Sequence, residues 1–443
     1  MQFDTITRDE ALQQLFAQWN PSPKRQTVAV NDAVGYICYE DIFSENIQPV
    51  FRASQMDGIA IKSKDFASGV PDTSQFKEGR DYVRADTGDD FSDDFDAVIR
   101  IENVTINEDG SITLKDVTSV AAGDNVEKCG GSLNHDDLLL PKGWRIRPVD
   151  IATLVRGGIS DVPVVCPPRI CFIPTGNELV PAGTKPQRGQ VVDCNSALAK
   201  HVLADMGAEV TCLPIVKDSL NELESALDNA LAIADIVLIN GGSSKGKDDY
   251  NTRLLRMRGN LLNHGVAAAP GRPMAIAIID GKPVINVPGP MVACCYVFDW
   301  CLRPVIAHAL GTRMQQHPIV RAKLTRDIGG REGMQFWNRV DLRVVKESDD
   351  AAGAVGAFSG NLDNADNFTS NNAGNCTGKS HVLSGNEVKF LAEPVSLHRE
   401  GGFYRIGVSS GQIISNPSGE TLLAGSDVDV ELLCDIAYLP RLP

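Results

Sequence analysis

The stretch DIVLINGGSSKGKDDY (Asp235–Tyr250) runs from apolar residues into glycines, serines, lysines and aspartates. Its apolar half is typical of a buried strand, and its Gly-Ser half predicts a turn that leads into a helix. Backbone N–H groups of such a turn can hold an oxyanion, and carboxylates beside it can hold a hard cation such as Mg²⁺. An ordinary strand-to-helix turn, with Asp248 or Asp249 as the helix cap, explains the same residues. The loop matches neither a P-loop nor a dinucleotide-binding fingerprint.

Apolar strands and helical segments alternate around this stretch, from residue 168 to about 316. This alternation predicts a doubly wound α/β domain whose strands are mainly parallel. Ligands of such sheets bind beyond the carboxyl ends of the strands. TGNE (Thr175–Glu178), VKDS (Val216–Ser219) and VPGP (Val287–Pro290) lie at predicted strand ends, so they are candidates to meet the Gly-Ser loop at one site.

The regions on either side have different patterns. Thr7 and Glu10 form a T-x-x-E pair that predicts a helix through about Trp19. Short apolar or alternating runs broken by Gly, Asp and Asn predict mostly β-structure from residue 26 to about 165, and a small β-barrel after about residue 317. Residues 346–380 are rich in Asn, Gly, Asp, Ser and Ala, a composition that predicts a flexible insertion between strands.

Composition narrows the class of protein. The chain has 443 residues, long enough for about two to four domains. Its formal net charge of -15 argues against a general binder of nucleic acid or anionic membranes. The N-terminus is not of the signal-peptide type, and no uninterrupted apolar run reaches the about 18 residues of a membrane span. Its eleven cysteines form no C-x-x-C pair, so we expect reduced thiols and a cytoplasmic protein.

Several acidic positions allow two interpretations each. Glu178 suits a metal ligand, although from its own surroundings a surface acid is the simpler interpretation. Asp57 beside Gly58 is typical of a D-G turn, and Thr87 beside Gly88 can face a ligand from an acidic loop. The seven histidines show no metal-ligand spacing, and no Ser-His-Asp elbow is present.

Read together in chain order, SQMDGIA, DTGDD, TGNEL, DCN, KDS, NGGSSKGKDDY, PGRP and VPG resemble the MoeA/gephyrin E-domain family of molybdopterin molybdenumtransferases. The resemblance covers Phe3 to about Gly311. It implies an elongated homodimer whose active site lies between the α/β domain of one subunit and the β-rich region of the other. The expected parts are residues 1–25 with 145–167 as a linking subdomain, 26–144 as a β-rich subdomain, 168–316 as the molybdopterin-binding α/β domain, and 317–443 as the barrel.

The resemblance also implies a reaction and a set of site residues. Molybdate would be inserted into adenylylated molybdopterin with release of AMP and with Mg²⁺ as the cofactor. Asp57, Thr87, Glu178, Asp218, Asp249 and Arg272 match positions implied to be catalytic, of which Glu178, Asp218 and Asp249 are implied metal ligands. The implied pterin contacts are Thr175, Gly176, Asp193, Asn195, Gly241, Gly242, Ser243, Ser244, Lys245, Lys247, Pro270, Gly271, Pro288 and Gly289. Molybdoenzymes or other biosynthetic proteins are implied partners.

Three motifs depart from the family pattern. KPGKP is here APGRP (Ala269–Pro273), PGNP is PGPM (Pro288–Met291), and RGED is CGGS (Cys129–Ser132). Lys245 and Lys247 stand where the family has an apolar residue and an acid, so they are expected to replace the lost positive charge. Three functions remain open: an active insertase, a paralogue that binds or delivers the cofactor as a scaffold, and an insertase for another oxyanion such as tungstate.

Overall fold

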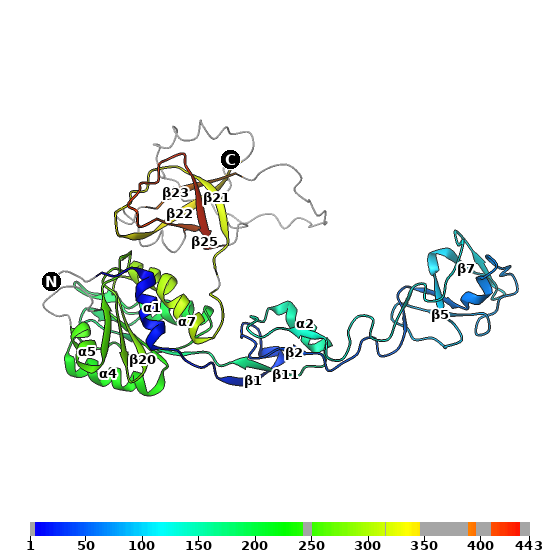
Figure 1. Ribbon diagram of the computed structural model, residues 1–443, viewed down its shortest axis with the longest axis horizontal. Helices are drawn as coiled ribbons and strands as arrows, with labels where there is room; N and C mark the ends of the chain where they lie inside the picture. Colours follow the sequence, from blue (N-terminus) through cyan, green and yellow to red (C-terminus); the bar gives the residue numbers. More distant parts are fainter. Residues whose placement is uncertain (1–4, 242–249, 315, 346–388, 396–408, 435–443) are drawn as a thin grey trace. The chain divides into compact units, whose positions relative to one another are not determined.

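The computed structural model describes residues 5–241, 250–314, 316–345, 389–395 and 409–434. By its internal contacts the chain forms two compact units, residues 1–22 with 167–443 and residues 23–166 (Figure 1). The larger unit contains an α/β part and a β-barrel. The insertion expected at 346–380 lies outside the described residues.

The α/β part is a six-stranded sheet with the strand order β15-β12-β16-β20-β19-β17. The first four strands are parallel, whereas β19 is antiparallel to β20 and β17 is antiparallel to β19. Its strands are nearly continuous apolar runs because both faces of the sheet are covered. The strands are β12 (Arg169–Pro174), β15 (Glu209–Cys212), β16 (Ile236–Asn240), β17 (Asn260–His264), β19 (Ala275–Ile279) and β20 (Lys282–Val287).

Helices cover both faces of this sheet, as predicted for a doubly wound domain. Leucines of α4 and α5 pack with Val237, Ile239 and Ile173 on one face. On the other face, Phe298 meets Phe172 edge to face at 6.4 Å. The helices are α3 (Asn195–Asp205), α4 (Leu220–Ile233), α5 (Tyr250–Arg258), α6 (Met291–Val297), the π-helical segment η4 (Phe298–Leu302) and α7 (Arg303–Ala309). Two short strands, β13 (Leu179–Val180) and β14 (Val191–Val192), pair with each other in a separate sheet.

Helices α6, η4 and α7 form one continuous run, Met291–Ala309. In the described part of the chain this is the one helix long and apolar enough to span a membrane. Much of it is buried in the structure, and it carries the ion pair Asp299–Arg303. These features are typical of a core helix.

The N-terminal helix α1 (Arg8–Gln18) begins as predicted. The Thr7 hydroxyl accepts from the Glu10 N–H, and the Glu10 carboxylate accepts from Thr7, which completes the capping box. The helix packs against this unit, since Arg8 Nε donates to the Trp300 carbonyl at 2.8 Å and Phe16 stacks on His308. The expected four-part division, which joined residues 1–25 to 145–167, stays a prediction; the contacts of α1 place it with the α/β part.

The C-terminal part is a closed five-stranded β-barrel, as predicted. Its strand order is β22-β23-β21-β25-β24, and β24 pairs again with β22. Its core contains Val340, Leu342, Ile413 and Val430. The strands are β21 (Ile319–Leu324), β22 (Gln335–Val345), β23 (Lys389–Pro394), β24 (Gly411–Ile414) and β25 (Asp427–Leu432), and β18 (Ala268–Ala269) joins β22 from the α/β part.

Residues 23–166 are mostly β-structure, as expected, with one helix that the sequence pattern did not predict. This helix, α2 (Pro148–Arg156), begins with a proline and is capped by the Asp150 carboxylate, which accepts from the Arg147 N–H. The strands are β1 (Arg25–Ala29), β2 (Ile42–Phe43), β3 (Ala53–Ser54), β4 (Gly58–Ile61), β5 (Tyr82–Ala85), β6 (Ala97–Arg100), β7 (Val104–Ile106), β8 (Ile112–Leu114), β9 (Val126–Glu127), β10 (Leu138–Leu140) and β11 (Asp161–Val165), with 3-10 turns η1 (Val30–Asp32), η2 (Ser63–Phe66) and η3 (Ile101–Asn103).

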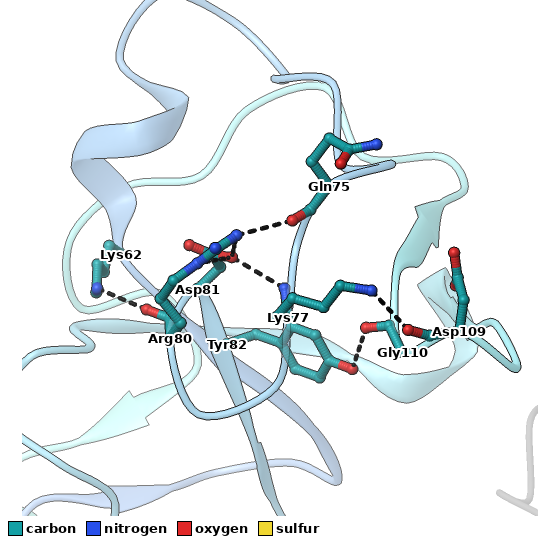
Figure 2. A network of polar contacts seen from close by, with 8 residues as sticks. All are labelled: Lys62, Gln75, Lys77, Arg80, Asp81, Tyr82, Asp109 and Gly110. Atoms are coloured by element: carbon teal, nitrogen blue, oxygen red, sulfur yellow. Dashed lines mark hydrogen bonds and ion pairs between the residues drawn. The ribbon is translucent and has the colours of Figure 1, made fainter.

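The loop before β5 is held by polar contacts (Figure 2). Arg80 pairs with Asp81 and donates to the Gln75 carbonyl, while Lys77 Nζ donates to the Asp109 carbonyl. The Tyr82 hydroxyl donates to the Gly110 carbonyl at 3.0 Å. These contacts fix the start of β5, the strand that leads to Thr87.

Candidate active site

Four parallel strands end side by side at one edge of the α/β sheet. The Thr175 N–H donates to the Asn240 carbonyl at 2.9 Å, and the Gly176 N–H donates to the Val216 carbonyl at 3.1 Å. The Gly241 N–H donates to the Val287 carbonyl at 3.0 Å. The ends of β12, β15, β16 and β20 therefore meet, which is the geometry expected from the sequence.

Gly241 sits where no side chain fits. Its φ is +120°, and a Cβ there would lie 2.5 Å from the Thr175 carbonyl oxygen and 2.7 Å from its hydroxyl. A Cβ on Gly289 would already touch the Gly241 Cα at 3.5 Å. The glycines thus allow the backbones to approach closely at this edge.

Buried asparagine side chains hold these loops in place by hydrogen bonds. Asn195 Nδ2 donates to Asn240 Oδ1 at 2.9 Å and to the Gly289 carbonyl at 2.7 Å. Asn240 Nδ2 donates to the Pro288 carbonyl at 2.9 Å, and Asn251 Nδ2 donates to the Gly241 carbonyl at 2.7 Å. Asn195 was expected to contact the pterin, and the structure places its amide nitrogen in this scaffold. The sequence pattern gave no signal for Asn251, and it assigned no role to Asn240, although Asn240 begins the NGGSS motif.

Two predicted metal ligands lie on adjoining turns. The Asn177 side chain accepts from the Asp218 N–H at 3.3 Å, which joins the turn carrying Glu178 to the turn carrying Asp218. The Glu178 carboxylate folds over Gly176, where a Cβ would lie 2.8 Å from its Oε1. Carboxylate and amide oxygens are ligands that Mg²⁺ prefers, so this donor set fits Mg²⁺.

Asp193 has a structural partner in the described chain. Its carboxylate accepts from the Ser196 N–H at 3.1 Å and from the Ser196 hydroxyl at 2.5 Å. It therefore caps the first turn of α3, a role that helix starts favour for aspartate.

The segment Pro270–Arg272 comes to the same edge by another route. Because β19 is antiparallel to β20, the loop entering β19 lies where β20 ends, as the pairing of Ala275 with Asn286 shows. The Pro270 carbonyl accepts from Trp300 Nε1 at 3.2 Å, and a Cβ on Gly271 would lie 2.7 Å from the Val297 side chain. The backbone carbonyl of Arg272 accepts from the Val266 N–H.

Asp57 and Thr87 belong to the other unit and contact each other directly. Asp57 Oδ1 accepts from the Thr87 N–H at 2.7 Å and from its hydroxyl at 2.8 Å. These bonds hold the pKa of the Asp57 carboxyl below its ordinary value. Gly58 begins β4, where it pairs with Ala85 and Arg100. A side chain does not fit there, because a Cβ would overlap the Ile99 carbonyl oxygen.

The other predicted loop residues, Gly242, Ser243, Ser244, Lys245, Lys247 and Asp249, lie outside the described residues. The remaining two departing motifs, Pro288–Met291 and Cys129–Ser132, lie within the described residues. Pro290 stands at the start of α6, where its carbonyl accepts from the Cys294 N–H. Cys129–Ser132 is a turn in which Gly131 donates to the Lys128 carbonyl and the Ser132 hydroxyl donates to Glu127.

A cation that the sequence did not single out lies against α6. Arg339 of β22 is 7% exposed, and its guanidinium lies 4.7 Å from the centre of the Tyr296 ring and 3.8 Å from the Cys295 sulfur. In the described ranges no carboxylate forms an ion pair with it. Burial raises the pKa of Tyr296 to about 12 and raises that of Cys295, so both neighbours are neutral at pH 7. A buried cation without a counter-ion is a candidate anion contact.

Comparison with known protein families finds a match in each of the two units. Residues 6–158 match the family described as MoeA N-terminal region (domain I and II), and residues 171–308 match the family described as probable molybdopterin binding domain. A molybdopterin molybdenumtransferase of Haemophilus influenzae is 29% identical over 324 residues, which covers 71% of this chain and 80% of that protein. The Staphylococcus aureus protein of the same name is 29% identical over 336 residues, covering 72% and 79%.

Solved structures show the same fold. The molybdopterin biosynthesis MoeA protein of Pyrococcus horikoshii superposes with a TM-score of 0.73 at 25% identity, covering 98% of this chain and all of the other. A second structure of that name superposes with a TM-score of 0.71 at 22% identity, covering 97% and 100%.

Proposed function

Because this chain belongs to the MoeA family of molybdenum cofactor biosynthesis, we propose that it is a molybdopterin molybdenumtransferase that inserts molybdate into adenylylated molybdopterin and releases AMP. The observation that carries the proposal is the meeting of a glycine turn and two carboxylate-bearing turns at one sheet edge. An anion and a hard cation can be held there together.

In the proposed reaction a water molecule attacks the phosphoanhydride, so that AMP leaves and a phosphate remains on the pterin. The two dithiolene thiol groups bind molybdenum, and the oxo ligand that they displace takes up their two protons and leaves as water. Gly241 and the loop after it bind the pterin phosphate. Glu178 and Asp218, with Asp249, hold Mg²⁺, which when bound polarises the phosphoanhydride and stabilises the departing AMP. Lys245, Lys247 and Arg272 neutralise the dianion, and Arg339 adds a fixed charge against α6.

The remaining implied features are part of the same proposal. The protein acts in the cytoplasm as a homodimer, and Asp57 with Thr87 of one subunit completes the site of its partner. The dimer is what the family resemblance implies, and Asp57 and Glu178 lie in different compact units of the chain. Asp57→Asn and Asp218→Asn proteins are expected to be inactive alone, whereas mixed dimers regain activity at one site.

The test of the activity uses purified protein, adenylylated molybdopterin, Mg²⁺ and molybdate. We expect AMP release together with a product that activates an apo-molybdoenzyme. Asp218→Asn should lower AMP release at least about tenfold, since loss of even an outer partner of a metal costs about 10- to 100-fold. Asp228→Asn, at a surface ion pair with Arg258, should not lower it.

Two other results would replace the proposed insertase activity with a different function. Binding of the adenylate without AMP release selects a scaffold or delivery protein, which the altered Pro290–Met291 and Cys129–Ser132 motifs favour. Turnover with tungstate but not molybdate selects an insertase for another oxyanion.

A further inference from the structure

A second cluster of metal-binding side chains lies away from the sheet edge, where the barrel meets the α/β part. Asp299 comes from η4, His317 from the segment between α7 and β21, and Glu431 from β25. One ligand atom from each lies within 4.8 Å of the others. The three side chains line a cavity of about 240 Å³, which provides an entry path.

Gln412 joins the two carboxylates of this cluster. Its Nε2 donates to Asp299 Oδ2 at 2.7 Å and to Glu431 Oε2 at 2.8 Å. The side chain is fully buried, and its Oε1 has no hydrogen-bond partner among the described residues. A buried amide that orients two carboxylates is what the outer partner of a metal site does.

The charges of the cluster do not balance without one further positive charge. Asp299 and Glu431 supply two carboxylates, while Arg303 supplies one guanidinium, whose Nη2 lies 2.8 Å from Asp299 Oδ1. Arg8 lines the same cavity but is paired with Asp9. A cation bound between the two carboxylates supplies the missing charge.

The geometry between His317 and Asp299 suits a shared metal ion. His317 Nε2 lies 3.0 Å from Asp299 Oδ1. Two ligands that each lie about 2.0–2.2 Å from one ion have such a separation when the angle between them is near a right angle. One imidazole nitrogen with two carboxylate oxygens suits Zn²⁺ or Mn²⁺ better than Mg²⁺, which prefers oxygen ligands alone.

We propose that Asp299, His317 and Glu431 bind one Zn²⁺ or Mn²⁺ ion, with Gln412 as the outer partner of both carboxylates and Arg303 as the outer partner of Asp299. The ion fastens the C-terminal barrel to the α/β part, because its ligands come from both. This site is separate from the proposed Mg²⁺ ligands Glu178, Asp218 and Asp249, so it stands whether or not the proposed activity does.

The test measures metal binding by the full chain. After EDTA treatment and buffer exchange, the protein is titrated with Zn²⁺ in a calorimeter in the presence of excess Mg²⁺. We expect one equivalent to bind and the unfolding temperature to rise. His317→Gln and Glu431→Gln, which keep hydrogen-bonding side chains, should each weaken binding at least about tenfold. His201→Gln, at an exposed position of α3, should not.

Cobalt substitution separates this site from binding to cysteine. A Co²⁺ adduct of the proposed site shows weak d–d bands without a thiolate-to-cobalt charge-transfer band. The unfolding temperatures of the metal-free variants show whether each variant is folded. If His317→Gln does not fold, Glu431→Gln alone tests whether the cluster binds the metal. The proposal is overturned if neither Zn²⁺ nor, in the same titration, Mn²⁺ binds, if binding survives both substitutions, or if the cobalt spectrum shows thiolate ligation.

Discussion

The Asp57 carboxylate accepts two hydrogen bonds from Thr87, one from its N–H at 2.7 Å and one from its hydroxyl at 2.8 Å. Asp57 immediately precedes β4 and Thr87 follows β5, and the two residues are brought together because Gly58 of β4 pairs with Ala85 of β5. Because these bonds favour the ionised carboxyl, the pair keeps Asp57 negatively charged to lower pH than an isolated aspartate.

Thr87→Val is therefore expected to raise the pKa of Asp57. The substitution removes the hydroxyl bond and keeps the N–H bond, so the pKa should move part of the way toward the ordinary value of about 3.9. A carbon-detected NMR titration of the Asp57 carboxyl measures this, and the acidic limb of AMP release should shift in the same direction. Thr87→Ser keeps both bonds and should leave the titration unchanged. Equal titrations in all three proteins would show that the hydroxyl does not act on Asp57.

Gly241→Ala is expected to destabilise the larger unit far more than Gly281→Ala. Both glycines have positive φ, +120° and +74°, but a Cβ would collide with Thr175 only at Gly241. Backbone strain alone costs about 1–2 kcal/mol, and forced overpacking adds about 1–3 kcal/mol. Urea unfolding should thus give a free energy of unfolding lower by about 2–5 kcal/mol for Gly241→Ala. Similar losses in the two variants would contradict the close approach.

The lysines of the Gly-Ser loop are expected to contribute to substrate affinity. The double substitution Lys245→Ala with Lys247→Ala removes two positive charges from the loop expected to bind the pterin phosphate. The dissociation constant should rise at least about tenfold, and it should depend less on salt concentration, since fewer ionic contacts remain. Lys115→Ala with Lys185→Ala removes two exposed lysines and serves as the control. An unchanged affinity would show that both loop lysines are merely solvated.

The strands of the sheet and the edge where they end could be predicted from the sequence. The side-chain contacts that support that edge could not. Apolar runs such as IVLIN and turn residues such as Thr175–Gly176 are local signals, so both the strands and the place where they end could be predicted. Arg339 and Cys295 are 44 positions apart, and the contact between them exists only after β22 packs on α6. Asn195 shows the same limit, because the motif that contains it suggested a ligand contact while its partners, Asn240 and Gly289, were set by the packed fold.

Arg339→Met is expected to separate function from stability. A buried guanidinium without a carboxylate partner contributes little to folding, and a methionine of similar length is often neutral or stabilising at such a place. Loss of a charge-assisted hydrogen bond to an anion removes about 1.5–3 kcal/mol, or roughly 10- to 150-fold in affinity. The unfolding temperature should therefore stay the same or rise, while the molybdate dependence of turnover weakens by that factor.

Arg339→Lys tests whether charge alone is sufficient. Lysine keeps the charge and loses the planar donor pair, so an intermediate affinity for molybdate is expected. Wild-type molybdate dependence in Arg339→Met would show that this cation serves packing only.

Asp150 is expected to stabilise the smaller unit in a pH-dependent way. Its buried carboxylate accepts from the Arg147 guanidinium at 2.8 Å and from Trp144 Nε1 at 2.8 Å, and these partners, with Arg147 the larger influence, lower its pKa. Asp150→Ala leaves the indole N–H and helix start without this acceptor and should cost about 2–4 kcal/mol at pH 7. Glu40→Ala removes a half-exposed ion pair with Arg25 and should cost about 0–1 kcal/mol.

The direction of the pH effect follows from the lowered pKa. The charged form of Asp150 is favoured in the folded state, so its contribution is fully present above the unfolded pKa of about 3.9 and is lost as pH falls toward the lower folded pKa. The difference in free energy of unfolding between wild type and Asp150→Asn should therefore narrow below about pH 4. Denaturant titrations at a series of pH values measure it. A difference that widens toward acid pH would mean that Asp150 is protonated more readily in the folded state than in the unfolded one, against its contacts with Arg147 and Trp144.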